Sequence, residues 1–381
     1  MKKTLIFLYL ILLGCQSQDV PPAYTLFENE TGAYSCYRIP AVIKSPDGSL
    51  LAFAEGRTAN CGDFGNVDIL IRKSTDGGLS WSTEKVLVDN GELQAGNPAP
   101  VVDYLDPYYP QGRLFLFYNT GSVGEQELRL GKGNREIHYI TSTDNGTSWS
   151  SPTNITEQVH FNATNSKTNL DWRTHANTPG HAIQLKKGVY RGRLYIPANH
   201  SKGPPQEGYN DYRAYGYYSD DHGLTWKVSP DVPFASSNEA IGVELTDGTL
   251  MLNIREQSGN TKLRIVALSS DGGATWDTLY FDPKLISPVC QSSILLFEDE
   301  KTPLLIYSGP NSTDKREKMT LKISLDNGKN WEYEKEVYSG GAAYSDLVQI
   351  DNKRIGLFYE KEFEKLVFEI FTPKAVLSER K

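Results

Sequence analysis

The chain has 381 residues, a formal net charge of −8 at pH 7 and a sequence pI near 5.4. An acidic balance argues against nucleic acid as a partner, because proteins bind phosphate backbones with surfaces rich in lysine and arginine. Aromatic residues make up 11% of the chain, which also has 33 glycines and 20 prolines, and no long segment repeats apolar residues at helical spacing. This composition favours an all-β protein.

The first 15 residues predict a bacterial secretion signal. Two lysines precede an apolar run that is too short to span a membrane. The run ends in LLGC, which resembles a lipoprotein processing site, so Cys15 would be lipidated and become the new N-terminus. We therefore expect a lipoprotein-type signal peptide over residues 1–15, a short tether over residues 16–23, and a protein of the bacterial cell envelope. The lipid anchor would be its only contact with the membrane, on the outer-membrane or periplasmic side. An ordinary cleaved signal, and hence secretion, is the alternative.

One phrase of eight residues recurs five times. It begins as STDGGLSW at Ser74 and returns, with small changes, at Ser142, Ser219, Ser269 and Ser324. Each copy follows a run rich in β-branched and aromatic residues, so each is predicted to be a hairpin turn after a strand. The aspartate suits a turn because its carboxylate accepts hydrogen bonds from backbone N–H groups, and the glycine because it tolerates a positive φ. The tryptophan would lie across the hairpin as a local anchor for its module.

The repeats predict a β-propeller, in which modules of roughly four strands are arranged around an axis. Five modules carry the repeat, and an unmarked stretch of strand type over residues 343–371 supplies a sixth. We therefore expect a single six-bladed β-propeller over residues 24–381. The early segment YTLFE, residues 24–28, would add the outer strand of the last blade and close the ring. These features predict a scaffold and indicate no chemistry by themselves.

Three features together resemble the bacterial exo-sialidases, also called neuraminidases. They are YRIPAVIKSPDGSLLAFAEGR, the five repeats, known in that family as Asp boxes, and YSGGAAYSDLVQI near the C-terminus. The resemblance runs from about residue 34 to residue 360. It implies a retaining exo-α-sialidase, a glycoside hydrolase that releases terminal sialic acids from glycoproteins, glycolipids and oligosaccharides without a metal or organic cofactor. The six histidines also form no metal-binding pattern such as HExxH.

Sialic acid carries a carboxylate on its anomeric carbon, and a site for it needs several guanidinium groups. Guanidinium pairs bidentately with a carboxylate and stays charged at every relevant pH. By resemblance the three substrate-binding arginines are Arg38 in YRIP, Arg255 in LNIRE and Arg316 in DKREKM. A propeller would bring these distant residues together by pointing its blades at a common axis.

The resemblance also implies three supporting residues. Arg57, in AEGR, matches an additional arginine that reaches the substituents of the sugar ring. Asn97, in GNPAP, stands where many relatives have an aspartate before proline, and is expected to contact the 4-hydroxyl of the ring. Glu360, in LFYEKE, is expected to orient Arg38 by holding its guanidinium.

The carboxylate of sialic acid would repel a carboxylate nucleophile, and sialidases use tyrosine instead. Tyr344, in AAYSDL, matches that position. A phenol with a pKa of about 10 needs a base nearby, for which Glu239 fits the family pattern and Glu244 is the alternative. Asp63, in NCGDFGNVD, matches the acid/base aspartate, with Asp68 as the alternative. To be protonated near neutral pH, Asp63 needs a pKa above about 3.9, which burial or the substrate's carboxylate would supply.

Cys36 and Cys61 each lie two residues before one of these positions, Arg38 and Asp63. Because an oxidising envelope permits disulfides, we expect a Cys36–Cys61 bond, with buried free thiols as the alternative.

Two other functions remain open from the sequence. One is a glycan-binding propeller lipoprotein that does not turn over a substrate. The other keeps the enzyme but changes its chemistry, either to a trans-sialidase that transfers sialic acid to another sugar or to action on a deaminated relative of sialic acid.

Overall fold

The computed structural model describes residues 22–162, 170–299 and 302–379. The predicted signal peptide over residues 1–15, with Cys15, and nearly all of the predicted tether lie outside these residues. Within them the chain is built from β-strands, which confirms the predicted all-β class. Its helices are short: α1 (Glu125–Arg129), α2 (Thr156–Val159) and α3 (Pro373–Leu377), with single 3₁₀ turns at Gly188–Tyr190 and Glu207–Tyr209. None of the helices in the described ranges is both long enough and apolar enough to pass through a membrane.

The strands form four hydrogen-bonded sheets. The eight-stranded sheet contains β2 (Cys36–Lys44), β3 (Leu50–Arg57), β4 (Val67–Ser74), β5 (Lys85–Val88), β6 (Gln94–Asp103), β7 (Arg113–Gly121), β8 (Arg135–Ser142) and β9 (Thr153–Asn154). The five-stranded sheet contains β10 (Trp172–Asn177), β11 (Ile183–Gln184), β12 (Leu194–Lys202), β13 (Tyr212–Ser219) and β14 (Lys227–Val228). The four-stranded sheet contains β15 (Ser237–Glu244), β16 (Leu250–Glu256), β17 (Leu263–Ser269) and β18 (Thr278–Ile286). The seven-stranded sheet contains β19 (Ser293–Phe297), β20 (Leu304–Pro310), β21 (Glu317–Ser324), β22 (Tyr333–Gln349), β23 (Ile355–Lys361), β24 (Lys365–Phe371) and β1 (Ala23–Glu28).

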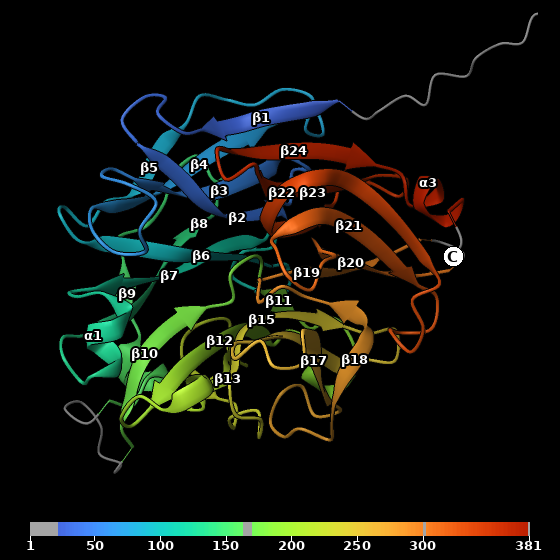
Figure 1. Ribbon diagram of the computed structural model, residues 1–381. Helices are drawn as coiled ribbons and strands as arrows, with labels where there is room; N and C mark the ends of the chain where they lie inside the picture. The colour runs from blue at the N-terminus through green and yellow to red at the C-terminus, as the bar shows by residue number, and fades with distance from the viewer. Residues whose placement is uncertain (1–21, 163–169, 300–301, 380–381) are drawn as a thin grey trace, which may run out of the picture.

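The two ends of the described chain meet in one sheet. β1 pairs antiparallel with β24, from Ala23 opposite Glu369 to Glu28 opposite Lys365. Figure 1 shows this first strand, in blue, beside the last one, in red. The predicted place of residues 24–28 as the outer strand beside the last strands of the chain is therefore confirmed. The last group of strands cannot separate from the start of the chain at this point without breaking this pairing.

All five copies of the repeat form turns that follow a strand, as the sequence predicts. They lie between β4 and β5, β8 and β9, β13 and β14, β17 and β18, and β21 and β22. In the first copy Asp76 Oδ1 accepts hydrogen bonds from the Ser74 hydroxyl and from the backbone N–H groups of Leu79 and Ser80, at 2.8 to 3.0 Å. A single carboxylate thus satisfies the backbone donors of the turn, which is why aspartate recurs there.

The tryptophans of the repeats do more than anchor their own hairpins. The ring of Trp81 lies 5.1 Å from that of Phe368 in β24, and the ring of Trp149 lies 6.3 Å from that of Phe53 in β3. Both partners lie on strands outside the tryptophan's own hairpin. The predicted local anchor is confirmed, because Trp81 Nε1 donates to the Gly78 carbonyl and Trp149 Nε1 to the Gly146 carbonyl of the same turn. The ring contacts add packing against strands outside the hairpin, which the sequence did not predict.

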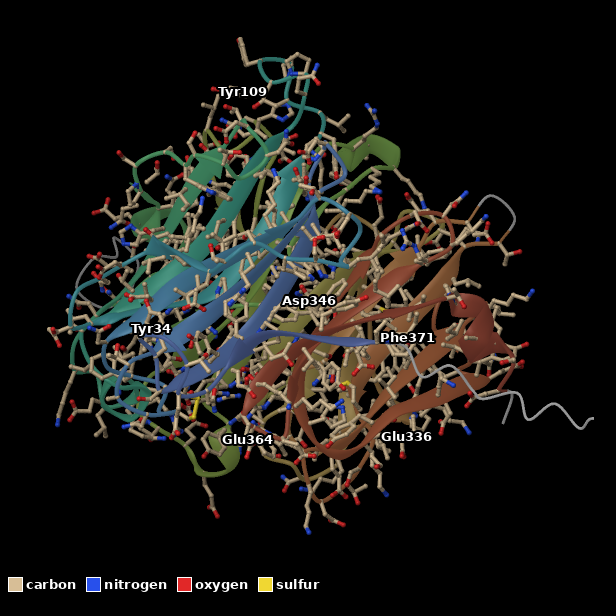
Figure 2. All side chains as sticks on the ribbon, turned by 90° about the horizontal axis from the view of Figure 1, so that it is seen from above. Tyr34, Tyr109, Glu336, Asp346, Glu364 and Phe371 are labelled. Carbon is tan, nitrogen blue, oxygen red and sulfur yellow. A yellow bond between two sulfur atoms is a disulfide. The ribbon has the colours of Figure 1, made fainter. Side chains whose placement is uncertain are left out.

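Asp346, labelled near the middle of the view in Figure 2, is buried, and its carboxylate ties several strands together. Its oxygens accept hydrogen bonds from the backbone N–H groups of Val42 and His181, from the His181 ring and from the Ser293 hydroxyl, at 2.7 to 3.0 Å. These donors come from β2, the segment before β11 and β19, whereas Asp346 lies on β22. A buried carboxylate with this many donors holds the first strands of separate groups in fixed positions.

Candidate active site

Four of the nine candidate residues lie at irregularities in strands. The pairing register shifts between Arg38 and Ala41 in β2, between Gly96 and Ala99 in β6, between Ser237 and Ala240 in β15, and between Ala342 and Ser345 in β22. Arg38, Asn97, Glu239 and Tyr344 lie at or inside these shifts. A β-bulge breaks the alternation of side chains and turns one of them in a new direction. The four strands therefore present polar side chains where regular pairing would have continued the core.

Tyr344, Glu239 and Arg255 form a buried hydrogen-bonded group. The Tyr344 hydroxyl donates to Glu239 Oε1 at 2.5 Å. Arg255 Nη1 donates to Glu239 Oε2 at 2.6 Å and to the Tyr344 oxygen at 3.0 Å. Burial and the charge of Glu239 raise the pKa of Tyr344 above its usual value, against the opposing effect of the nearby arginines. Tyr344 is therefore a neutral phenol, with a carboxylate oxygen placed to accept its proton.

Arg38 and Arg316 lie beside the ring of Tyr344. Their guanidinium carbons are 5.0 Å and 5.6 Å from the centre of that ring. With Arg255 at the hydroxyl, the structure brings the three predicted arginines around one tyrosine, from β2, β16 and the residue before β21. Arg316 Nη2 also donates to the Val289 carbonyl at 2.9 Å, so this side chain is held in place and is not a solvated surface charge.

Glu360, on β23, holds both Arg38 and the backbone next to it. Its carboxylate accepts from Arg38 Nε at 3.1 Å, from Arg38 Nη2 at 3.2 Å and from the Ile39 N–H at 3.1 Å. Ile39 has a φ of 60°, which is a strained conformation for a β-branched residue. Glu360 thus stabilises the unusual backbone that aims Arg38, in the position that the resemblance implies for an orienting carboxylate.

Glu55 is a buried site residue that the sequence did not single out. Its Oε2 accepts from Arg57 Nε at 3.0 Å and from Arg57 Nη2 at 2.6 Å, and its Oε1 accepts from the Asn97 N–H at 2.8 Å. Glu55 therefore joins the predicted Arg57 and Asn97 in one unit. The signal was present in AEGR, because residues two apart on a strand project from the same face.

Asp63 lies in the exposed loop between β3 and β4, beside the arginines. Its Oδ1 accepts from Arg57 Nη1 at 2.8 Å and lies 3.5 Å from Arg38 Nη1, while 77% of the side chain is exposed. The surrounding protein desolvates the carboxylate, which raises the pKa of Asp63, but the charges of Arg57 and Arg38 outweigh this effect and the net pKa is below the usual value. The expectation that burial would give Asp63 a raised pKa is therefore wrong.

The two alternative carboxylates, Asp68 and Glu244, have other hydrogen-bond partners. Asp68 is buried on β4, where its Oδ2 accepts from the Tyr34 hydroxyl at 2.7 Å. Glu244, at the end of β15, accepts from the backbone N–H groups of Lys186 and Lys187 at 2.8 and 3.0 Å. Neither contacts Tyr344 or Arg57 through a described hydrogen bond, so the geometry favours Asp63 and Glu239.

A cavity of about 460 Å³ lies at the other ends of the same strands. Its walls include Val42 in β2, Val102 in β6, Val243 and Glu244 in β15 and Val348 in β22. On each of these strands the candidate residue precedes the cavity residue in the chain, and apart from the alternative Glu244 no candidate lines the cavity. The arginine cluster and this cavity are therefore separate features at opposite ends of the strands.

One group of side chains in the described part of the chain has the composition of a metal site. Asp103, Asp106 and His222 place ligand atoms within 4.8 Å of one another. However, the ring of His222 is hydrogen-bonded to Asp103 at 2.8 Å, and Arg113 pairs with Asp106 at 2.8 Å. These partners already satisfy the carboxylates, so the chemistry of this group does not require a metal ion.

The predicted disulfide between Cys36 and Cys61 is present, and Figure 2 draws it as a yellow bond. Cys36 begins β2 and lies opposite Arg57 of β3, whereas Cys61 belongs to the loop of Asp63. The third described cysteine, Cys290, is a buried free thiol.

These features define the class of the protein: a β-propeller in which three arginines surround one buried tyrosine. Comparison with known proteins agrees. A family model described as a BNR repeat-like domain matches residues 48–358. The chain is 32% identical to a sialidase of Micromonospora viridifaciens over 361 residues, covering 89% of this chain and 52% of that protein. It is 30% identical to Sialidase-2 of Cricetulus griseus over 384 residues, covering 92% of this chain and 95% of that protein.

A solved structure, that of a Hadza microbial sialidase, has a TM-score of 0.81 at 26% sequence identity over 93% of this chain and 69% of that one. The chain therefore belongs to the sialidase family. It spans about half the length of the relative from Micromonospora viridifaciens, 52%.

Proposed function

We propose that this protein is a retaining exo-α-sialidase that hydrolyses terminal sialic acids from glycoproteins, glycolipids and oligosaccharides. The observation that carries the proposal is the Tyr344 hydroxyl, bonded to Glu239 and Arg255 with Arg38 and Arg316 beside the ring. A phenol paired with a base and surrounded by guanidinium groups suits the cleavage of a glycoside that itself carries a carboxylate. The similarity to proteins named as sialidases supports the same reaction.

In this proposal Arg38, Arg255 and Arg316 bind the carboxylate of the sugar. Arg255 already contacts the Tyr344 hydroxyl, at 3.0 Å, so a carboxylate that shares this arginine brings the anomeric carbon next to the phenol. Arg57 and Asn97, joined through Glu55, contact substituents of the ring, including its 4-hydroxyl. Fixing the substrate by its charge and by one edge of the ring supplies the orientation on which the attack depends.

The reaction proceeds in two steps. In the first, the Tyr344 oxygen bonds to the anomeric carbon and the bond from that carbon to the leaving oxygen breaks. Glu239 takes the phenol proton, and Asp63 gives a proton to the leaving oxygen. In the second, Asp63 takes a proton from a water molecule, the water oxygen attacks the anomeric carbon, and the Tyr344 oxygen leaves and recovers its proton from Glu239. Two inversions release the α-anomer first.

The charges of the site explain how Asp63 gains the proton that it donates. Four arginines and four carboxylates lie together, so the ionised cluster sums to zero: Arg38, Arg57, Arg255 and Arg316 with Glu55, Glu239, Glu360 and Asp63. An anionic substrate adds one negative charge and competes with Asp63 for the arginines. Protonation of Asp63 restores neutrality, so substrate binding loads the general acid.

We also propose that the four sheets make six blades of one propeller over residues 24–381. β22, with 17 residues, belongs first to the group β19–β22 and then to the group β22, β23, β24 and β1. The eight-stranded sheet divides into β2–β5 and β6–β9, which are linked by the parallel pairing of Val67 with Gln94. With the five-stranded and four-stranded sheets, this division gives six groups of four strands, and β11 is an additional short strand.

The N-terminal sequence supports a lipid-anchored location in the bacterial envelope, with Cys15 as the modified residue. Mass spectrometry of the mature protein would identify a lipidated Cys15 as its first residue. Replacing Cys15 by serine would then move the protein from the membrane fraction to the soluble fraction. An unmodified N-terminus at another residue would contradict the anchor and leave secretion as the proposal.

Turnover of a fluorogenic aryl sialoside tests the enzymatic proposal directly. Wild type should be active, Tyr344→Phe should lose nearly all hydrolysis, and Tyr108→Phe, at an exposed tyrosine, serves as the matched control. An NMR time course should show α-sialic acid as the first product. An inactive wild type would leave a glycan-binding propeller, β-sialic acid first would contradict retention, and a sialylated acceptor as the main product would indicate a trans-sialidase.

A further inference from the structure

The loop that carries Asp63 has little packing of its own. It joins β3 to β4 over residues 58–66, and residues 58–64 are exposed. The Thr58 N–H donates to the Asn66 carbonyl at 3.1 Å and closes the base of the loop. The Gly62 N–H donates to Asn60 Oδ1 at 2.7 Å within it. These contacts shape the loop but do not fix its tip relative to the arginines.

Two attachments hold the tip of the loop. One is the disulfide of Cys61 with Cys36, whose Cα atoms are 5.2 Å apart. Cys36 is buried at the start of β2, opposite Arg57 and two residues before Arg38. The other is formed by arginines: Arg57 Nη1 donates to the Cys61 carbonyl at 2.6 Å and to Asp63 Oδ1 at 2.8 Å, and Arg38 Nη1 lies 3.5 Å from Asp63 Oδ1. The disulfide therefore ties the acid loop to the strands that carry two of the arginines.

The two attachments respond differently to protonation. A general acid must be protonated when the substrate is bound, and a neutral carboxyl loses the charge that pairs it with Arg57. The Asp63 side of the Arg57–Asp63 ion pair is also exposed to solvent, and exposed ion pairs contribute little stabilising free energy. A covalent bond does not depend on the charge of the carboxyl. The hydrogen bond from Arg57 Nη1 to the Cys61 carbonyl does not depend on that charge either. The disulfide is thus the covalent attachment that persists while the proton is transferred.

We propose that the Cys36–Cys61 disulfide positions Asp63 for protonation of the leaving oxygen, and that cleavage of substrates with poor leaving groups depends on it. The inference rests on the proposed function of Asp63 as the general acid. Proton transfer requires the donor within about 2.6–3.2 Å of the leaving oxygen. A displacement of about 1 Å in a catalytic geometry costs up to about a hundredfold in rate. Departure of an activated phenol needs little protonation, so it should tolerate such a displacement.

The test compares two substrates in wild type and in Cys36→Ala/Cys61→Ala. On sialyllactose, whose leaving group is a sugar alcohol, kcat of the double variant should fall about tenfold to a hundredfold. On an aryl sialoside with an activated phenol leaving group, kcat should fall by less than about threefold, because this group leaves with little protonation by Asp63. KM for the aryl sialoside should change little, because the arginines that bind its carboxylate are unaltered. Asp63→Asn should give the same pattern with a larger loss on sialyllactose.

Reduction of the folded wild type provides a second measurement that does not depend on how the double variant folds. A dithiol reductant transfers two electrons and two protons, converts the disulfide into two thiols, and itself becomes a disulfide. Reduced wild type should match the double variant, whereas the reductant should not change the double variant. Cys290 is present in both, so an effect through that thiol would appear in both.

Two outcomes would overturn the inference: equal losses on the two substrates with native circular dichroism, or full activity on sialyllactose without the disulfide. The proposed function fails separately, because an inactive wild type on both substrates would contradict sialidase activity before any variant is made.

Discussion

Binding of a carboxylate ligand should be accompanied by uptake of about one proton. The experiment measures binding at several pH values. The ligand is the unsaturated analogue of sialic acid, whose carboxylate is ionised above about pH 4. Arg57 and Arg38 hold the pKa of Asp63 below its usual value in the free protein. When the ligand occupies the arginines, this stabilisation of the Asp63 anion is lost and a second anion lies beside it, so the pKa of Asp63 rises.

The magnitude follows from the charges on the structure. The eight ionised groups sum to zero, and the ligand adds one negative charge that one proton cancels. Linkage then requires the apparent Kd to rise about tenfold per pH unit between the pKa of Asp63 in the free protein and its pKa in the complex. Below this window Asp63 is protonated in both states, and above it Asp63 is ionised in both, so the slope falls to zero on either side.

Isothermal titration calorimetry in buffers with different ionisation enthalpies measures the number of protons taken up. Wild type should take up about one proton in the weakly acidic range, and the Kd of Asp63→Asn should be nearly independent of pH there. Wild type with no proton uptake from pH 4 to 7 would refute the reasoning. Uptake that persists in Asp63→Asn would also refute it, because another group would then bind the proton.

Three further predictions follow from single contacts. Glu239→Gln should lower kcat by about 10²- to 10⁴-fold. Because the charge of Glu239 contributes to the raised pKa of Tyr344, its removal should lower that pKa, and the residual activity should increase with pH as the phenol ionises. A flat pH profile between pH 6 and 9 would contradict this role. Asp346→Asn should place an amide NH₂ group opposite donors such as the Val42 and His181 N–H groups. Two donors left unsatisfied should lower the free energy of unfolding, measured by urea denaturation, by about 2–6 kcal/mol. The control Asp299→Asn, at an exposed position, should stay within about 0.5 kcal/mol of wild type. Arg57→Gln should raise the pKa of Asp63, because Arg57 is the largest charge that lowers it, and the alkaline limb of kcat/KM on sialyllactose should move to higher pH; movement to lower pH would argue against Asp63 as the acid.

The sequence could identify the residues of the candidate site but not the backbone that aims them. Arg38 in YRIP and Tyr344 in AAYSDL are found by short motifs, because each motif is local in the chain. The bulges at these positions are defined by pairing with β3 and β23, and pairing register is a property of two strands at once. Glu55 was missed for a related reason: its role becomes visible only when the Asn97 N–H of another strand is placed against it.

The same limit applies to the repeats. Their turns were predicted correctly because the donors and the carboxylate lie within eight residues. The partners of the tryptophans, such as Phe53 for Trp149, come from strands outside the hairpin, and periodicity along one chain segment does not show which neighbour it meets. The expectation that burial alone would raise the pKa of Asp63 was wrong, because the competing charges of Arg57 and Arg38 could be weighed only with distances in hand. The effect of a bound carboxylate on that pKa stays a prediction.

The pairing of charges in the site separates two tasks that arginines perform. Arg38 pairs with Glu360, Arg57 with Glu55 and Arg255 with Glu239, each at 3.1 Å or less. These carboxylates fix the guanidinium groups and cancel their charge, so the three arginines supply geometry more than net attraction. Across the described ranges no carboxylate oxygen lies within ion-pair distance of Arg316, whose Nη2 donates to a backbone carbonyl. Once Asp63 is protonated, the charge of Arg316 is no longer balanced within the site. The site therefore attracts the substrate's carboxylate most strongly when Asp63 carries the proton that it donates as general acid.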